Sequence, residues 1–195
     1  EIRLSLVGSE MCIRDSYRDV LGVIHESFDA IPITQNYILQ LHKMLYSHMN
    51  NPFAGRTKTV QNYISATYPD GQTEVLFTPM APFETPEALD RICGEYNRVI
   101  GNFEVEPLIV IPVFIHDFLC IHPFNDGNGR MSRLLTTLLL YRSGFYVGKY
   151  ISLEAKIAGN KELYYESLGK AQASWHEGTE DVIPFIKYLL GTILA

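Results

Sequence analysis

The stretch His122–Arg133 reads HPFNDGNGRMSR and decides the fold, because it joins two helical segments through a tight turn. Gly127 and Gly129 have no Cβ, so the backbone can turn sharply and aim its N–H groups at one point. Leucines then recur at spacings of three and four residues from Leu134 to Leu139, which predicts a helix that begins at this turn. The free N–H groups of such a helix N-terminus favour an anion, typically a phosphate.

Charged side chains in the same stretch fit phosphate chemistry. Arg130 and Arg133 are three residues apart, so they share a helix face and can reach one anion. Asp126 precedes the turn, where a carboxylate can hold a Mg²⁺ that bridges phosphate oxygens. His122 ends the preceding element, and its ordinary pKa suits a general base near neutral pH. The glycines alone leave a plain loop open, with Asp126 as a helix cap, and the joint occurrence of these side chains favours a phosphate cradle beside a base.

This stretch resembles the signature of the Fic family, HxFx[DE]GNGRxxR, and meets every fixed position of it. The matching residues are His122, Phe124, Asp126, Gly127, Asn128, Gly129, Arg130 and Arg133. The resemblance extends to the flanks and covers the chain from about Gly55 to the C-terminus. It implies transfer of a nucleotide moiety, usually AMP from ATP, to a Ser, Thr or Tyr hydroxyl of a target protein.

The resemblance also implies a role for each motif residue. Mg²⁺ is expected on Asp126, and the turn Gly127-Asn128-Gly129 is expected to hold the phosphates of ATP. Arg130 and Arg133 are expected to neutralise the triphosphate, and His122 to take the proton from the target hydroxyl. Phe124 carries no such chemistry and is expected to be a buried anchor of the loop.

Three residues further along are assigned to the nucleotide by the resemblance: Tyr164, Tyr165 and Gln172. The second tyrosine of the pair borders the adenine in the family. The position of Gln172 is usually Asn, so this chain departs from the family pattern there. Two alternatives therefore stay open: a phosphotransferase, other nucleotidyltransferase or de-AMPylase on the same scaffold, and a non-catalytic nucleotide-sensing regulatory module. His122 weighs against the second, because a pure binder needs no base.

The hydrophobic patterns predict an all-α helical bundle with one small β-hairpin, and the resemblance implies that it is a Fic-type bundle in which the hairpin is a flap. Pro107–Ile121 is apolar almost all round, so it is expected to be the buried central helix that delivers His122. Lys161–Trp175 is expected to form another helix. Two β-prone runs, Tyr63–Thr67 and Glu74–Thr78, flank a turn sequence and predict the hairpin.

Partners are predicted from the resemblance. The hairpin, residues 63–78, is expected to be a flap whose exposed edge docks the target protein by strand addition. Many family members are held inactive by a glutamate of an [ST]xxxE[GN] segment that pairs with the second arginine, here Arg133. The sequence contains no such segment. An inhibitory segment or an antitoxin-like partner that contacts Arg133 is therefore a candidate partner, and without it the chain is expected to be unrestrained.

Composition narrows the remaining classes. The 195 residues fit one domain, and the net charge of −6 argues against a nucleic-acid surface. No apolar run is long enough for a membrane span. Three cysteines without paired spacing argue against a disulfide framework and a zinc site, so a reducing, cytoplasmic setting is expected.

The other histidines are interpreted as structural. His25, His42 and His48 lie on or near two predicted N-terminal helices, and none has a partner at metal-ligand spacing, so they are expected to be structural or surface residues. His116 lies on the predicted central helix and is expected to be a satisfied core histidine.

The first 16 residues are interpreted separately. Leu6–Asp15 reads LVGSEMCIRD and resembles the translation of a transposase sequencing adapter. The native sequence is therefore expected to begin near Ser16 or Tyr17, with residues 17–195 as a Fic domain truncated at its N-terminus. The chain stops without a helix-ending signal, so the natural protein is expected to continue beyond Ala195.

Overall fold

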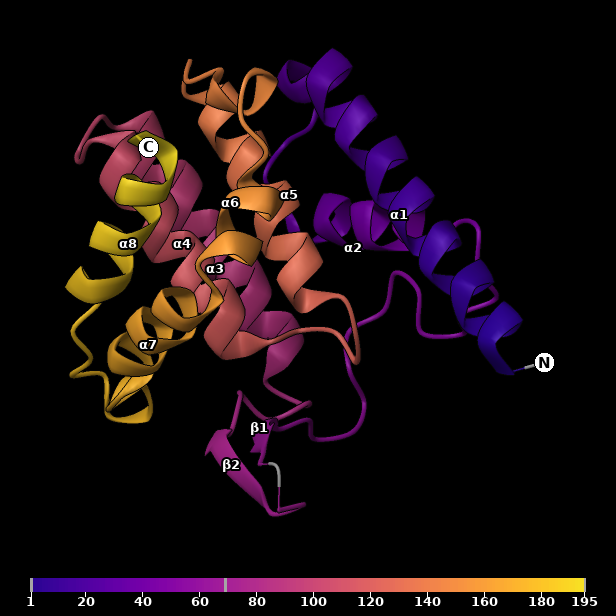
Figure 1. The fold of residues 1–195 in the computed structure, drawn as a ribbon. Coiled ribbons are helices and arrows are strands. Elements are labelled where there is room, and N and C mark those ends of the chain that lie inside the picture. The colour runs from indigo at the N-terminus through magenta and orange to yellow at the C-terminus, as the bar shows by residue number, and fades with distance from the viewer. Residues whose placement is uncertain (1, 69, 195) are drawn as a thin grey trace.

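The helix α4 (Pro107–Ile121) lies at the centre of the computed structural model, which describes residues 2–68 and 70–194 (Figure 1). Because α4 is apolar on every side, it must be covered on every side. The helices that pack against it are α3 (Thr85–Gly101), α5 (Asn128–Arg142), α7 (Lys161–Gln172) and α8 (Ile183–Leu194). Phe118 and Ile111 of α4 are fully buried in the resulting core. The predicted all-α bundle and its buried central helix are therefore confirmed.

The remaining helices cover the other side of α5. The helix α1 (Ile2–Ser27) packs against α5 and α2 (Gln35–Met44), and Figure 1 shows it on the side of the bundle opposite α7 and α8. A short helix, α6 (Leu153–Gly159), and three 3₁₀ turns complete the chain: η1 (Phe28–Ala30), η2 (Val147–Lys149) and η3 (Trp175–Glu177). Among the helices of the described residues, none combines the length and apolarity that crossing a membrane requires.

The hairpin projects from one end of the bundle (Figure 1). Its strands β1 (Ile64–Thr67) and β2 (Thr73–Phe77) pair antiparallel, close to the predicted bounds. The base of β2 is tied to η3, because the Phe77 ring packs against Trp175 and His176. His176 Nε2 also donates to Thr78 O at 2.8 Å.

One helix extends into the first 16 residues, and one predicted helix boundary is corrected. The helix α1 begins at Ile2 and runs without a break through the residues interpreted as adapter-derived; a helical conformation does not test that origin, which stays a prediction. The helix predicted over Lys161–Trp175 ends at Gln172, because Ala173 is extended and Ser174 is left-handed with φ 59.

A substitution in α5 tests whether this helix belongs to the core. Leu138 is completely buried, so Leu138→Ala is expected to lower the free energy of unfolding by about 2–5 kcal/mol. Leu163→Ala on the exposed side of α7 is the matched control and is expected to change it by less than about 0.5 kcal/mol. Urea denaturation followed by circular dichroism measures both. Equal losses in the two variants would contradict this packing.

Candidate active site

His122 lies where α4 ends. It is the C-cap residue of α4 and has the left-handed conformation, with φ 50 and ψ 61, and its N–H donates to Phe118 O at 2.9 Å. A non-glycine residue rarely adopts this conformation, which costs about 1–3 kcal/mol and persists only where the surroundings enforce it. The strained turn places the imidazole at the junction between α4 and the loop that leads to α5.

The hydrogen bonds of His122 fix its tautomer. Nδ1 lies 3.2 Å from Leu119 O, and a carbonyl only accepts, so Nδ1 carries the proton and Nε2 keeps its lone pair. The pKa of His122 is lowered to about 4: burial is the main cause, the bond to Leu119 O opposes it, and the charge of Lys58 adds to the lowering. The imidazole is therefore neutral near pH 7 and can accept a proton through Nε2.

Asp126 is held by two side chains. Tyr46, just beyond α2, donates its hydroxyl to Asp126 Oδ2, and Arg130 Nη2 donates to both Tyr46 OH and Asp126 Oδ2 at 2.8 Å. Burial by itself would raise the pKa of Asp126, but the bond from Tyr46 and the charge of Arg130 outweigh it and hold the pKa below its usual value. The carboxylate is therefore ionised at neutral pH.

His42 of α2 supports the same loop from beneath. Its Nδ1 accepts from the Gly55 N–H at 2.9 Å, so Nε2 carries the proton and donates to Asp126 O at 3.0 Å. The imidazole stacks on Phe124, with ring centroids 3.7 Å apart, and Phe124 is fully buried, as expected of an anchor. The interpretation of His42 as structural is confirmed, and burial lowers its pKa to about 4.

Asn128 and Gly127 close the loop. The Asn128 side chain is buried, accepts from the Phe124 N–H at 2.9 Å and donates to Phe124 O at 2.7 Å. Its amide side chain is therefore committed to the loop, and only its main-chain N–H is left for a ligand. Gly127 is the N-cap of α5 with φ 85, and a Cβ there would lie 2.9 Å from Tyr46 OH. Gly129, by contrast, has an ordinary helical conformation and no such close contact.

The arginines of α5 leave buried donors without partners. Arg130 Nη1 and Arg133 Nε are buried and donate to no partner among the described residues. Arg133 Nη2 donates to Glu154 Oε1 of α6 at 3.0 Å. A buried unpaired N–H costs about 1–3 kcal/mol, and the first N–H groups of α5 also lack carbonyl partners. Both arginines lie in the first turns of α5, and an anion bound at the helix N-terminus is the kind of partner that such donors need.

The three residues assigned to the nucleotide on α7 lie in different surroundings. Tyr164 is largely buried among Tyr165 and Tyr188, and although burial raises its pKa, the nearby charge of Arg133 opposes this, so Tyr164 lies beside the motif helix. Tyr165 is 61% exposed. Gln172 is buried, and its Nε2 has no partner within the described part of the chain.

The donor set suits magnesium only together with a substrate. Within residues 2–68 and 70–194, no group of three or more His, Cys, Asp or Glu side chains could hold a metal ion. Mg²⁺ in phosphate-binding sites, however, takes one or two carboxylates and completes its shell with phosphate oxygens and water. The Asp126 side chain is 70% exposed and can supply such a carboxylate.

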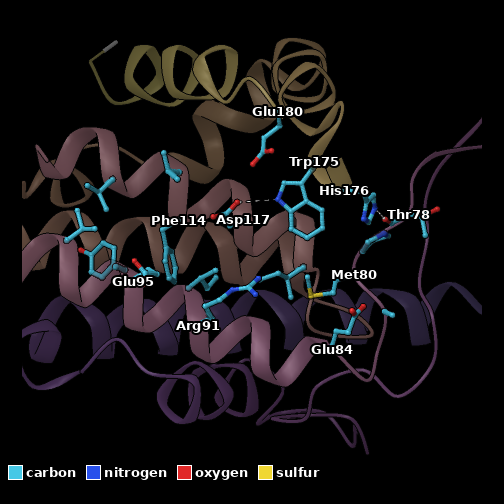
Figure 2. Close-up of a pocket in the computed structure, with 18 of the residues that line it drawn as sticks. Thr78, Met80, Glu84, Arg91, Glu95, Phe114, Asp117, Trp175, His176 and Glu180 are labelled. Atoms are coloured by element: carbon cyan, nitrogen blue, oxygen red, sulfur yellow. Dashed lines mark hydrogen bonds between the residues drawn. The ribbon is translucent and has the colours of Figure 1, made fainter. Parts of the chain in front are cut away.

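A large groove lies away from the motif. A groove of about 760 Å³ between α3 and α4 reaches the base of the hairpin, where Trp175 and Met80 line it (Figure 2). Trp175 Nε1 donates to Asp117 Oδ1 across one side of it at 3.4 Å. The groove is lined by none of the motif residues. Cavity size alone would therefore direct attention away from the clustered chemistry.

Several site residues were not predicted from the sequence: Tyr46, Lys58, Asn62 and Glu154, together with the loop-supporting role of His42. His42 and Tyr46 are four residues apart, a spacing visible in the sequence that would place two residues on the same side of a helical segment, here at the end of α2 and in the turn after it. Nothing local indicates that this face meets a loop 80 residues later.

Comparisons with known proteins agree on one family. A model of the Fic/DOC family matches residues 32–140, more than half of the chain. A Fido domain-containing protein of Dictyostelium discoideum is 31% identical over 111 residues, which are 55% of this chain and 73% of that protein.

Longer relatives are named as enzymes. Protein adenylyltransferase fic-1 of Caenorhabditis elegans is 27% identical over 184 residues, 94% of this chain and 31% of that protein. Protein adenylyltransferase Fic of Drosophila willistoni is 29% identical over 196 residues, 97% of this chain and 34% of that protein. The chain thus spans about a third of the length of these relatives.

Solved structures share the fold. A Fic domain containing signaling protein from Bacteroides thetaiotaomicron superposes with a TM-score of 0.73 at 22% identity, over 93% of this chain and 67% of that chain. Fic-1 from C. elegans superposes with a TM-score of 0.68 at 25% identity, over 91% of this chain and 47% of that chain.

Two glycines test the contact between the loop and Tyr46. Gly127 and Gly144 have nearly equal φ values of 85 and 84, so Gly→Ala imposes the same backbone strain at both, but only at Gly127 does a Cβ meet another atom. Gly127→Ala is therefore expected to lower the free energy of unfolding by about 1–3 kcal/mol more than Gly144→Ala. Urea titrations of both variants measure the difference, and equal losses would contradict the close approach of Tyr46.

The buried imidazole of His42 predicts a pH dependence of stability. Its pKa is about 4 in the folded chain and near the ordinary 6.5 when unfolded, so the unfolded chain binds more protons between these values. The free energy of unfolding is therefore expected to fall as the pH is lowered from 6.5 towards 4. In His42→Gln this fall should be shallower. An unchanged slope in that variant, measured by urea titrations across the range, would rule out the neutral buried imidazole.

Proposed function

Because the chain belongs to the Fic/DOC family, we propose that it is a protein adenylyltransferase, which transfers AMP from ATP to a hydroxyl side chain of a target protein. The observation that carries the proposal is the pairing of a neutral imidazole with an anion site. His122 offers a free Nε2, and two arginines on the next helix hold buried donors without partners.

His122 acts as the general base. Its Nε2 takes the proton of the target hydroxyl as the hydroxyl oxygen bonds to the α-phosphorus of ATP, and the bond to the β-phosphate breaks to release pyrophosphate. The bond from Nδ1 to Leu119 O holds the imidazole in the tautomer that this step needs. A low pKa keeps the base free of protons well below neutral pH.

The N-terminus of α5 binds the triphosphate. The first N–H groups of α5, those of Asn128, Gly129 and Arg130, favour an anion, and the guanidinium groups of Arg130 and Arg133 add positive charge in the same turns of the helix. Asp126 would hold Mg²⁺, which neutralises phosphate charge when bound. Tyr165 and Gln172 of α7 would border the adenine.

Arg133 connects this site to regulation. Its present partner is Glu154, whose carboxylate carries less negative charge than a triphosphate. A γ-phosphate, or the glutamate of an inhibitory segment or antitoxin-like partner, would have to displace Glu154 from Arg133. The target itself would dock on the 63–78 hairpin, where Val75 and Leu76 are exposed beside a free strand edge. Two buried free thiols, Cys93 and Cys120, fit a reducing cytoplasmic compartment.

Labelled ATP distinguishes this reaction from its alternatives. With ATP labelled at the α-phosphate, Mg²⁺ and a cell lysate as the source of target, wild type is expected to label protein and His122→Ala to lose at least about 100-fold in rate. His48→Ala is the control, because His48 is exposed and pairs with Asp19 away from the site. Label transferred from the γ-phosphate instead would indicate a phosphotransferase, and no transfer from either position would indicate a regulatory module.

A further inference from the structure

The segment that leads into the hairpin donates hydrogen bonds to four successive carbonyl groups of the turn after α4, residues 121–124. Residues 58–62 precede β1, and their donors reach the main chain of residues 121–124. Lys58 Nζ donates to Ile121 O at 3.0 Å, Asn62 Nδ2 to His122 O at 3.3 Å, the Lys58 N–H to Pro123 O at 2.8 Å, and Asn62 Nδ2 to Phe124 O at 3.0 Å. No other described segment contacts this turn through so many hydrogen bonds.

Burial of the charged Lys58 side chain costs free energy. Its side chain is 2% exposed, and its ammonium donates to Ile121 O and to Asn62 Oδ1 at 2.8 Å. Within the described residues it pairs with no carboxylate. Burying a cation among neutral acceptors costs free energy that an apolar side chain of the same length would not. Packing alone therefore does not account for a lysine here.

The two side chains act on both sides of His122. Rotation about φ of His122 swings the peptide group that carries the Ile121 carbonyl, and rotation about ψ swings the one that carries the His122 carbonyl. Lys58 holds the first and Asn62 holds the second. Together they fix the two dihedral angles of a residue that is held in a strained conformation.

We propose that Lys58 is a positioning residue for His122, with Asn62 as its partner, and that the two hold the left-handed turn that aims the imidazole at the target hydroxyl. In this proposal Lys58 acts through the turn and has no contact with the substrate, because its ammonium donates to Ile121 O and Asn62 Oδ1. Its kinetic consequence rests on the proposed adenylyl transfer, whereas its effect on the imidazole does not.

The charge of Lys58 has a second effect on the same imidazole. Burial is the main cause of the low pKa of His122, and Lys58 is the titratable side chain whose charge lowers it further. Burial in turn lowers the pKa of Lys58 to about 8, so the ammonium remains mostly charged at pH 7. Removing the cation should therefore make His122 easier to protonate.

Three variants and one control test the proposal on the full chain. Lys58→Met removes the donor and the charge, Lys58→Arg keeps both, and Asn62→Ala frees the His122 carbonyl while Phe124 O keeps its bond from Asn128. Lys187→Met on the exposed face of α8 is the control. The pKa of His122 is measured by NMR of its ring, without nucleotide, and kcat and KM for ATP by α-phosphate transfer.

The expected pattern separates positioning from packing. Lys58→Met should raise the pKa of His122 by about 0.5–1 unit and lower kcat by about 10- to 100-fold, with KM for ATP changed less than about threefold. Lys58→Arg should restore most of kcat. Asn62→Ala should lower kcat while the pKa of His122 stays near that of wild type, because Lys58 is still present. Lys187→Met should match wild type in both.

Failure of the Lys58 proposal can be distinguished from failure of the proposed function. An unchanged His122 pKa and kcat in Lys58→Met would show that the lysine is only packing, while wild-type transfer activity would still support the enzyme. Absence of transfer in wild type would defeat the proposed function, and the NMR titrations would then decide the role of Lys58 alone. If Lys58→Met does not fold, wild-type kcat in Asn62→Ala would overturn the proposal.

Discussion

The site depends on the reversal of the chain between two buried helices, from Ile121 at the end of α4 to Asn128 at the start of α5. Part of this reversal, at Pro123 and Phe124, is buried, and the carbonyl and N–H groups there need partners within the protein. Here the partners come from three places: His42 beneath the loop, Lys58 and Asn62 behind it, and Asn128 from within it. Satisfying the backbone in this way also fixes His122 in its strained turn.

The same reversal concentrates charge at the N-terminus of α5. Arg130 is paired with Asp126 and Arg133 with Glu154, so each guanidinium group has a carboxylate partner and still keeps a buried N–H without one. A triphosphate would satisfy these remaining donors, and to reach Arg133 fully it must replace one carboxylate. The groove of about 760 Å³ between α3 and α4 is lined by neither of these arginines and by neither of their carboxylate partners (Figure 2).

Local patterns in the sequence predicted the parts of this arrangement that local physics determines. The apolar run before His122, the leucines after Arg133 and the turn between two β-prone runs each specified an element that the structure contains. Local patterns do not predict which residues far apart in the sequence will form hydrogen bonds. Lys58 and Tyr46 lie 63 and 80 residues from the groups they bind, in segments without a diagnostic pattern. The motif likewise did not predict that the Asn128 side chain forms hydrogen bonds with the main chain of Phe124.

A crystal structure with a non-hydrolysable ATP analogue and Mg²⁺ tests the account most directly. We expect the triphosphate on the first N–H groups of α5, the α-phosphate within reach of a hydroxyl that faces His122 Nε2, and Arg133 released from Glu154. An analogue bound in the groove between α3 and α4, or an imidazole turned away from the phosphates, would contradict it.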